Sequence, residues 1–130
     1  MARNEVYKDA NYLSLPVPTG RLSGQAVRIG GVAVGLNGVL QTNEGSVDKP
    51  AGNYNEAPSS NKAGFASVAL IGAWRLPVNT TATLAIGDPV YIIPGTNVLT
   101  PSSAGNSLFG HALSAKGAVS DQLVIVRIAN

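Results

Sequence analysis

The sequence contains no cysteine and a single histidine, His111. Without cysteine the chain has no disulfide framework, no Cys-based zinc site and no thiol nucleophile. A metal site or a Ser-His-Asp triad would depend entirely on His111, and no serine stands in the G-x-S-x-G pattern of hydrolases. We expect His111 to lie on a strand face beside Phe109 and Leu113 and to make one hydrogen bond there. Stability is expected to come from packing and assembly.

Charged residues are scarce, since they make up 12% of the chain, against about 25% in an average soluble domain. Nine Lys and Arg against seven Asp and Glu give a formal net charge of +2. The basic residues are scattered from Arg3 to Arg127 and form no basic stripe, so direct binding of nucleic acid is not expected. A surface so poor in charge suits packing against other protein surfaces, which indicates symmetric assembly or a permanent partner.

The chain also lacks long apolar runs: none approaches the roughly 18 residues of a membrane span, and residues 1–12 lack the apolar core of a signal peptide. We therefore expect synthesis in the cytoplasm and no contact with a membrane. The glycine-rich residues 30–38 match neither the phosphate-binding loop nor the G-x-G-x-x-G spacing. The carboxylates are spread one at a time, and Asp88, in Gly-Asp-Pro, is predicted to hold a turn. The sequence thus predicts no enzyme activity, no metal and no cofactor.

Helical periodicity is nearly absent, because Gly or Pro interrupts every apolar pattern of helical spacing about a dozen residues long. Short β-branched segments separated by Gly, Pro, Asn and Asp predict strands instead. This many short strands predicts an all-β fold, either a small curved β-barrel or a β-sandwich. The predicted strands are residues 12–16, 25–29, 31–40, 64–71, 73–77, 90–93, 97–100, 107–113 and 122–128.

At this length the chain is expected to form one domain with one core. Period-2 alternation assigns the following residues to that core: Val27, Ile29, Val124, Val126 and Ile128. The opposite faces of the same strands take Ala26, Arg28, Leu123, Ile125 and Arg127. Glycines that interrupt apolar runs are predicted to mark bulges, barrel corners or close backbone approach, and they are Gly35, Gly38, Gly72 and Gly110.

Two segments depart from the strand pattern. Residues 1–24 mix charges, two tyrosines, Pro16 and Pro18, and they are predicted to form an extended N-terminal arm with at most one edge strand. Residues 25–130 are predicted to be a single β domain. Within it, residues 41–63 are polar and have little to bury beyond Tyr54, so we expect a long polar loop, either a partner-binding loop or a mobile tip.

Tyrosine, tryptophan and arginine are the candidates for contacts with a partner, because these types are enriched at binding hot spots. Trp74 also fits a core position, which is the more common place for tryptophan. Residues of the arm are included because residues 1–24 have too little periodic apolar character to fold alone. The candidate contact residues are Arg3, Glu5, Tyr7, Lys8, Tyr12, Tyr54, Trp74 and Arg75.

Blocks spread along the chain carry a resemblance to a known family. They are the start MARNEVYKDANYLSLPVPTG leading into SGQAV, the pair RIGGVAVGL, the block SVALIGAWRLPV followed by LAIGDPVY, and the closing LFGHALSAKG and VIVRI. On these patterns of turns and apolar positions, the chain resembles phage capsid decoration, or cement, proteins of the DUF2190 class. Relative to that family, residues 41–63 look like an insertion.

The resemblance implies a structural, non-catalytic protein that binds the outer surface of an assembled icosahedral phage head. Such a protein bridges neighbouring major capsid proteins and stabilises the shell against the pressure of the packaged genome. It would be made in the host cytoplasm, reside in the virion and form a homo-oligomer, with a trimer favoured. One alternative stays open: a glycan- or host-surface-binding β-domain, which would use exposed aromatic residues such as Trp74 or Tyr54.

Overall fold

A computed structural model describes residues 12–45 and 63–130 of the chain. Within these two ranges the chain forms nine strands and no helix, which confirms the predicted all-β fold. Each strand overlaps a predicted one. The strands are β1 Tyr12–Pro16, β2 Ala26–Gly30, β3 Gly35–Leu40, β4 Phe65–Ala69, β5 Ala73–Val78, β6 Pro89–Ile92, β7 Leu99–Thr100, β8 Ser107–Ala112 and β9 Gln122–Ile128.

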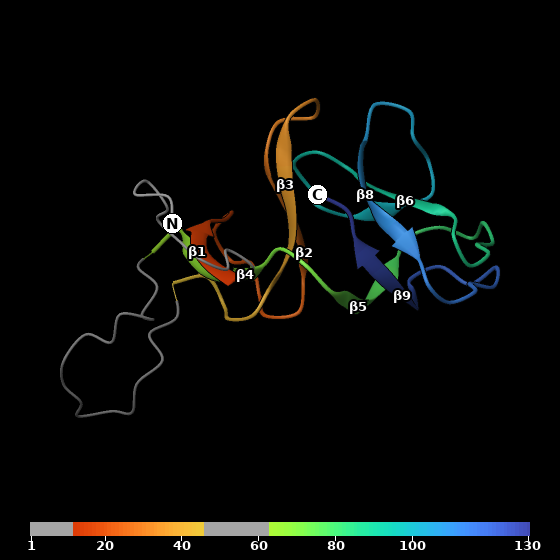
Figure 1. Ribbon diagram of the computed structural model, residues 1–130, viewed down its shortest axis with the longest axis horizontal. Helices are drawn as coiled ribbons and strands as arrows, with labels where there is room; N and C mark the ends of the chain where they lie inside the picture. Colours follow the sequence, from red (N-terminus) through yellow and green to blue (C-terminus); the bar gives the residue numbers. More distant parts are fainter. Residues whose placement is uncertain (1–11, 46–62) are drawn as a thin grey trace, which may run out of the picture.

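The strands are arranged in two bodies, a four-stranded antiparallel sheet and a closed barrel. The order in the sheet is β1-β4-β3-β2, and the order around the barrel is β5-β7-β6-β8-β9. Figure 1 shows the barrel beside the sheet, with the long β2–β3 hairpin between β4 and the barrel. The closed barrel confirms one of the two predicted architectures. β1 pairs with β4 over its whole length and forms one edge of the sheet.

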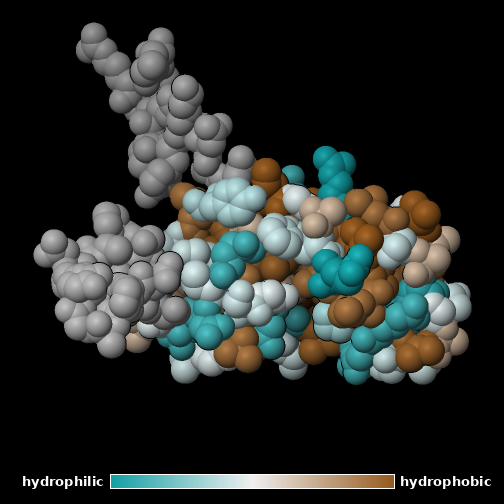
Figure 2. Space-filling view, turned by 90° about the horizontal axis from the view of Figure 1, so that it is seen from below, coloured by the Kyte–Doolittle hydropathy of each residue, from teal (hydrophilic) through white to brown (hydrophobic). Residues whose placement is uncertain are grey.

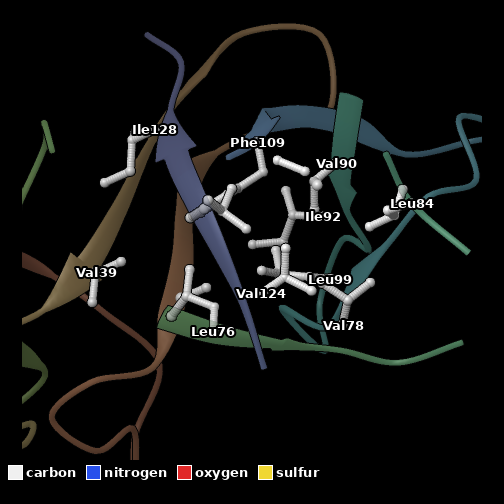
Figure 3. Packing of buried hydrophobic residues seen from close by; sticks show 13 residues of the cluster. Val39, Leu76, Val78, Leu84, Val90, Ile92, Leu99, Phe109, Val124 and Ile128 are labelled. Atoms are coloured by element: carbon white, nitrogen blue, oxygen red, sulfur yellow. The ribbon is translucent and has the colours of Figure 1, made fainter. Parts of the chain in front are cut away.

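The barrel encloses the larger of two apolar clusters. Strand β9 points Val124, Val126 and Ile128 inward, as its alternation predicts, and Phe109 of β8 is fully buried beside them. Figure 3 shows Phe109 and Val124 converging with Val90, Ile92 and Leu99 from the strands around the barrel. Each large apolar side chain buried in this way contributes about 1.5–3 kcal/mol to the free energy of folding. The cluster contains Ala26, Val39, Leu76, Val78, Leu84, Val90, Ile92, Leu99, Phe109, Ala112, Val124, Val126 and Ile128.

A second apolar cluster fills the other face of the sheet, so the expectation of a single core is wrong. It contains Val17, Val27, Leu40, Ala66 and Val68, with Leu15, Ile29 and Leu70 packed against it. The hairpin β2–β3 supplies both clusters, because successive side chains of a strand point to opposite faces. Val27 and Leu40 face the second cluster, whereas Ala26 and Val39 face the barrel. Val27 is therefore buried as predicted, while Ala26 is buried as well.

A polar network joins the hairpin to the end of the barrel. The side-chain amide of Asn37, which is 3% exposed, donates to the carbonyls of Leu108 and Ala129, each at 2.8 Å. The side chain of Asn130 exchanges two hydrogen bonds of 2.8 Å with the backbone of Asn37. Nη1 of Arg28 donates to Oδ1 of Asn37 at 2.8 Å. Buried polar groups need such partners to offset the loss of water. Asn37 thus ties the sheet to the barrel.

The β8 strand contains a bulge that changes the predicted place of His111. Val90 pairs with Gly110 and Tyr91 pairs with Leu108, so β8 has one extra residue, Phe109, between these pairs. An extra residue shifts the alternation by one position. Phe109 therefore points into the barrel while His111 is exposed, and the prediction that the two share a face is wrong.

Three of the predicted strand glycines lie where the backbone comes close to a neighbour, and Gly35 is one of them, since a Cβ atom there would stand 2.7 Å from the carbonyl oxygen of Ile29. A Cβ atom on Gly110 would stand 2.0 Å from the carbonyl oxygen of Arg127 on β9. A Cβ atom on Gly38 would stand 2.4 Å from Cγ1 of Val68 and 2.8 Å from the carbonyl oxygen of Ala69. Only glycine allows these approaches, which confirms the predicted meaning of the three positions.

The predicted strand 31–40 begins only at Gly35, because the four residues before it form the tip of the β2–β3 hairpin. The amide of Gly31 donates to the carbonyl of Val34 at 2.7 Å, which closes the tip. Nε of Arg28 donates to the carbonyl of Gly31 at 2.8 Å, so this side chain stabilises the turn. Side-chain bonding of the backbone in a turn competes with continuation of the strand.

The prediction that Asp88 holds a turn is confirmed, since its carboxylate accepts a hydrogen bond from the amide of Ala85 at 2.8 Å.

The described residues on the two sides of residues 46–62 are hydrogen-bonded to one another at the sheet. The carboxylate of Glu44 accepts the backbone amides of Gly20 at 3.2 Å and Gly64 at 2.6 Å. These two bonds hold the pKa of Glu44 below its usual value, and the bond from Gly64 has the larger effect. The amide of Gly45 also donates to the carbonyl of Phe65 at 2.8 Å. Residues 41–45, the start of the predicted polar loop, are therefore bonded to the sheet.

Candidate functional site

Five of the candidate contact residues lie outside the described residues: Arg3, Glu5, Tyr7, Lys8 and Tyr54. Tyr12 is the first described residue, stands opposite Ala69 on the edge strand β1 and is 59% exposed. Trp74 and Arg75 lie on β5 of the barrel. The described candidates therefore occupy two different bodies and do not form one cluster.

Trp74 and Arg75 are neighbours in sequence that face opposite ways. The indole of Trp74 packs against the barrel cluster and donates its Nε1 hydrogen to the carbonyl of Ile71 at 3.0 Å. Trp74 is partly buried, whereas Arg75 is exposed. Alternation along β5 causes the difference. Trp74 thus combines a packing role with limited exposure, and Arg75 is free to meet a partner.

Arg75 belongs to a continuous outward surface of three barrel strands. β5 pairs with β9, and β9 pairs with β8, so outward side chains from all three strands adjoin one another. We call this surface the outer barrel face. It consists of Ala73, Arg75 and Pro77 of β5, Leu123, Ile125 and Arg127 of β9, His111 of β8 and the following Leu113. Sequence alternation placed the three β9 residues on one face, but it contained no information on which strands would flank them.

Lys116 is the one charged side chain that is less than a tenth exposed within the described ranges, and sequence reasoning did not single it out. Its ammonium donates to the carbonyls of Thr80 at 2.5 Å and of Ala82 and Gly117 at 2.9 Å each. Its backbone exchanges two hydrogen bonds with Leu84. A buried charge requires such compensation. Lys116 therefore closes one end of the barrel and has a structural role.

A cleft of about 220 Å³ lies between the sheet and the barrel. Arg21, Gln25, Asn97 and Asp121 contribute polar groups to it, and Leu76 contributes apolar surface. Arg21 donates to the carbonyl of Ala26 through Nη2, and burial lowers the pKa of its guanidinium. Across the described ranges no three His, Cys, Asp or Glu side chains gather in a way that could hold a metal ion.

Apolar side chains are common on the surface. Figure 2, which views the molecule from below Figure 1, shows apolar residues interspersed with hydrophilic ones over the coloured surface. The exposed large apolar residues are Tyr12, Leu22, Val32, Val34, Leu36, Ile71, Ile86, Leu108, Leu113, Val119 and Leu123. None of the described segments is a helix long and apolar enough to cross a membrane.

The described residues thus define a small all-β protein in which a closed barrel is joined to a sheet and apolar groups are spread over the surface. A family model described as phage cement protein matches residues 8–128. The chain belongs to this family, which confirms the resemblance drawn from its sequence. No curated protein and no solved structure matches it. Membership of the cement proteins indicates a structural, non-enzymatic role in association with the phage capsid.

Proposed function

We propose that the protein binds the outer surface of an assembled icosahedral phage head, contacts the major capsid protein and stabilises the shell without catalysing a reaction. The observation that carries this proposal is the match of the cement family over residues 8–128. The low content of charge supports it, because a surface with 12% charged residues suits contact with other protein surfaces.

Shell stabilisation follows from mass action. A protein that binds the mature shell, and not its dissociated or unexpanded forms, stabilises that shell by RT ln(1 + [L]/Kd). Many weak contacts repeated by symmetry provide avidity without a large interface per copy. A cyclic homotrimer fits this requirement best, because each trimer would engage several neighbouring capsid subunits at once.

The N-terminal arm and the polar loop are proposed to add to this binding. Tyr12 stands exposed at the edge of the sheet, directly after the candidate residues Arg3, Glu5, Tyr7 and Lys8. Contacts of these residues with a capsid or subunit neighbour would tether each copy. Deletion of residues 2–12 is expected to leave the β domain folded and to weaken retention on the shell or self-assembly.

Cosedimentation with phage shells tests the proposed function. Expanded shells that lack the protein are titrated with it, and we expect it to pellet with the shells and raise their melting temperature with concentration. Unexpanded shells serve as the control and are expected to retain less protein. Failure to pellet with either form of shell would refute the proposal, and specific retention on a glycan array would then favour a glycan-binding β-domain.

A further inference from the structure

The described cations fall into two groups. The described ranges contain five Lys and Arg residues, namely Arg21, Arg28, Arg75, Lys116 and Arg127. Arg21, Arg28 and Lys116 each donate to backbone carbonyls and have structural roles in a loop, a hairpin tip and a barrel end. The side chains of Arg75 and Arg127 have no hydrogen-bond or ion-pair partner among the residues that the structure describes, and both are exposed.

These two unpaired arginines lie on the outer barrel face, on neighbouring strands. Arg127 of β9 stands opposite Ala73 of β5, two residues from Arg75 along the same face. It also stands opposite the exposed His111 of β8. Residues opposite one another in an antiparallel pair point to the same side. One end of the outer barrel face is therefore basic.

The other end of the same face is apolar. Ile125 stands opposite Arg75, and Leu123, which is 55% exposed, stands opposite Pro77. Leu113 is 43% exposed and donates its backbone amide to the carbonyl of Ile125 at 2.6 Å, so it lies beside that residue. Apolar surface edged by arginine is typical of the composition of protein interfaces.

The described carboxylates do not neutralise this face. Glu44 is bonded to the backbone at the sheet, and Asp88 is bonded to the amide of Ala85. Asp121 lines the cleft between the sheet and the barrel, which also reaches Pro77 at the apolar end of the face. None of the three forms an ion pair with Arg75 or Arg127 in the described ranges.

We propose that the outer barrel face is the surface that docks on the capsid, and that the capsid site presents carboxylates next to apolar side chains. This inference rests on the proposed function and adds the docking surface and the chemistry of the partner. Each exposed arginine can bind a carboxylate through two parallel hydrogen bonds. Pairing of two such faces around a two-fold axis is disfavoured, because it would bring arginines together without a carboxylate.

Charge reversal on this face provides the test. The variant Arg75→Glu/Arg127→Glu is expected to weaken binding to expanded shells by about tenfold or more, because it places like charges against the acidic site. The variant Arg75→Gln/Arg127→Gln removes two positive charges and is expected to weaken binding less. Binding of the wild-type protein is expected to fall as salt is raised, and the Gln variant is expected to lose most of that salt dependence.

A matched control separates the surface from net charge. The variant Thr83→Glu/Ala104→Glu changes the net charge by the same amount as the Gln variant, at two exposed barrel positions outside the outer barrel face. It is expected to bind shells like the wild-type protein. Thermal melting of every variant reports whether the barrel is folded, and exposed substitutions of this kind are expected to shift the melting temperature little.

The outcomes distinguish this inference from the proposed function. If the wild-type protein pellets with shells and the Glu variant pellets equally well, the docking surface is wrong and the proposed function stands. If the Glu variant changes the oligomeric state and keeps its affinity for shells, the face is an interface between copies, and the inference is overturned. If the wild-type protein does not bind shells, the proposed function and the inference fall together.

Discussion

The barrel and the sheet are built from similar short strands, but they differ in how their edges are closed. Every barrel strand has two neighbours, whereas the sheet ends at β1 and β2. The barrel comes from one continuous stretch of chain and encloses the larger cluster, while the sheet collects strands from both sides of residues 46–62 and buries the smaller one. Unpaired edges and a small core lower local stability. We therefore expect the stability of the sheet to depend on the barrel through the β2–β3 hairpin, which contributes to both clusters.

A matched pair of core truncations provides the strongest test of this difference. Leu76 in the barrel and Leu40 in the sheet are each 1% exposed. Leu→Ala changes in cores cost about 2–5 kcal/mol, with the larger values where the surroundings cannot collapse. We expect the loss of stability in Leu76→Ala to be near the upper end of this range, because a closed barrel adjusts little. The loss in Leu40→Ala is expected to be near the lower end.

Native-state hydrogen exchange measures where each variant opens. Leu40→Ala is expected to expose the amides of β2, β3 and β4 while the barrel amides keep their protection. Leu76→Ala is expected to lower protection in both bodies. Equal loss of protection everywhere in Leu40→Ala would show that the two bodies unfold as one.

A pair of glycine substitutions compares the strand contacts. In Gly110→Ala the new Cβ would stand 2.0 Å from the carbonyl oxygen and 2.9 Å from the carbonyl carbon of Arg127, both backbone atoms that cannot rotate away. In Gly38→Ala the new Cβ would stand 2.4 Å from the side-chain atom Cγ1 of Val68 and 2.8 Å from the carbonyl oxygen of Ala69, so its backbone contact is less close than at Gly110. Overpacking costs about 1–3 kcal/mol. We expect Gly110→Ala to reach or exceed that range and Gly38→Ala to cost less in urea denaturation.

The control for these substitutions is Gly117→Ala, where the nearest atom would stand 3.4 Å from the new Cβ. This distance is an ordinary contact, so the variant is expected to unfold at a urea concentration close to that of the wild-type protein. A loss of stability in Gly117→Ala as large as that in Gly110→Ala would show that close approach is not the cause.

Removal of the buried ammonium tests the closure of the barrel end. Lys116→Met keeps most of the side-chain volume and leaves the carbonyls of Thr80, Ala82 and Gly117 without this donor. Buried groups left without a partner cost about 1–3 kcal/mol, and we expect a loss in this range by thermal or urea unfolding. Arg75→Met, which removes an exposed cation with no partner in the described ranges, is expected to change stability little. Equal effects of the two variants would contradict the structural role of Lys116.

The smallest expected effect concerns the pH dependence of the sheet. The backbone amides of Gly64 and Gly20 lower the folded-state pKa of Glu44 from its ordinary value of 4.5. Its stabilising contribution is therefore present above that ordinary value and is lost as the pH falls through the lower folded pKa. We expect Glu44→Gln to reduce the acid sensitivity of hydrogen exchange in β3 and β4 and to leave the barrel unchanged. An unaltered pH profile in the sheet would contradict this role.

Local patterns predicted the strands well because the alternation of apolar residues and the turn residues act over a few positions. The β9 residues Val124, Val126 and Ile128 are buried as predicted, and Asp88 holds its turn. The errors arise where distant contacts decide. The bulge at Phe109, which faces β6, shifts the phase of β8. The late start of the predicted strand 31–40 is a local exception, because residues 31–34 form the hairpin tip to which Arg28 donates.

The candidate site shows the same division. Arg75 was predicted as a contact residue and is exposed, whereas Trp74, also a candidate, packs largely against the barrel. Arg127 was recognised as outward-facing, but its place beside His111 and Arg75 follows from strand pairing with β8 and with the more distant β5. Nothing in the sequence around Lys116 or Asn37 indicated that these polar side chains would be buried.

The sequence by itself determined the all-β class, most strand positions, the inward face of β9 and membership of the cement family, because each depends on residue types within short windows or along the whole chain. The tertiary structure alone decided that the strands divide into a closed barrel and a separate sheet. It also decided that the two faces of one hairpin enter different clusters, and that two unpaired arginines share one surface. These features depend on which strands become neighbours, and pairing between distant segments leaves no pattern within either segment.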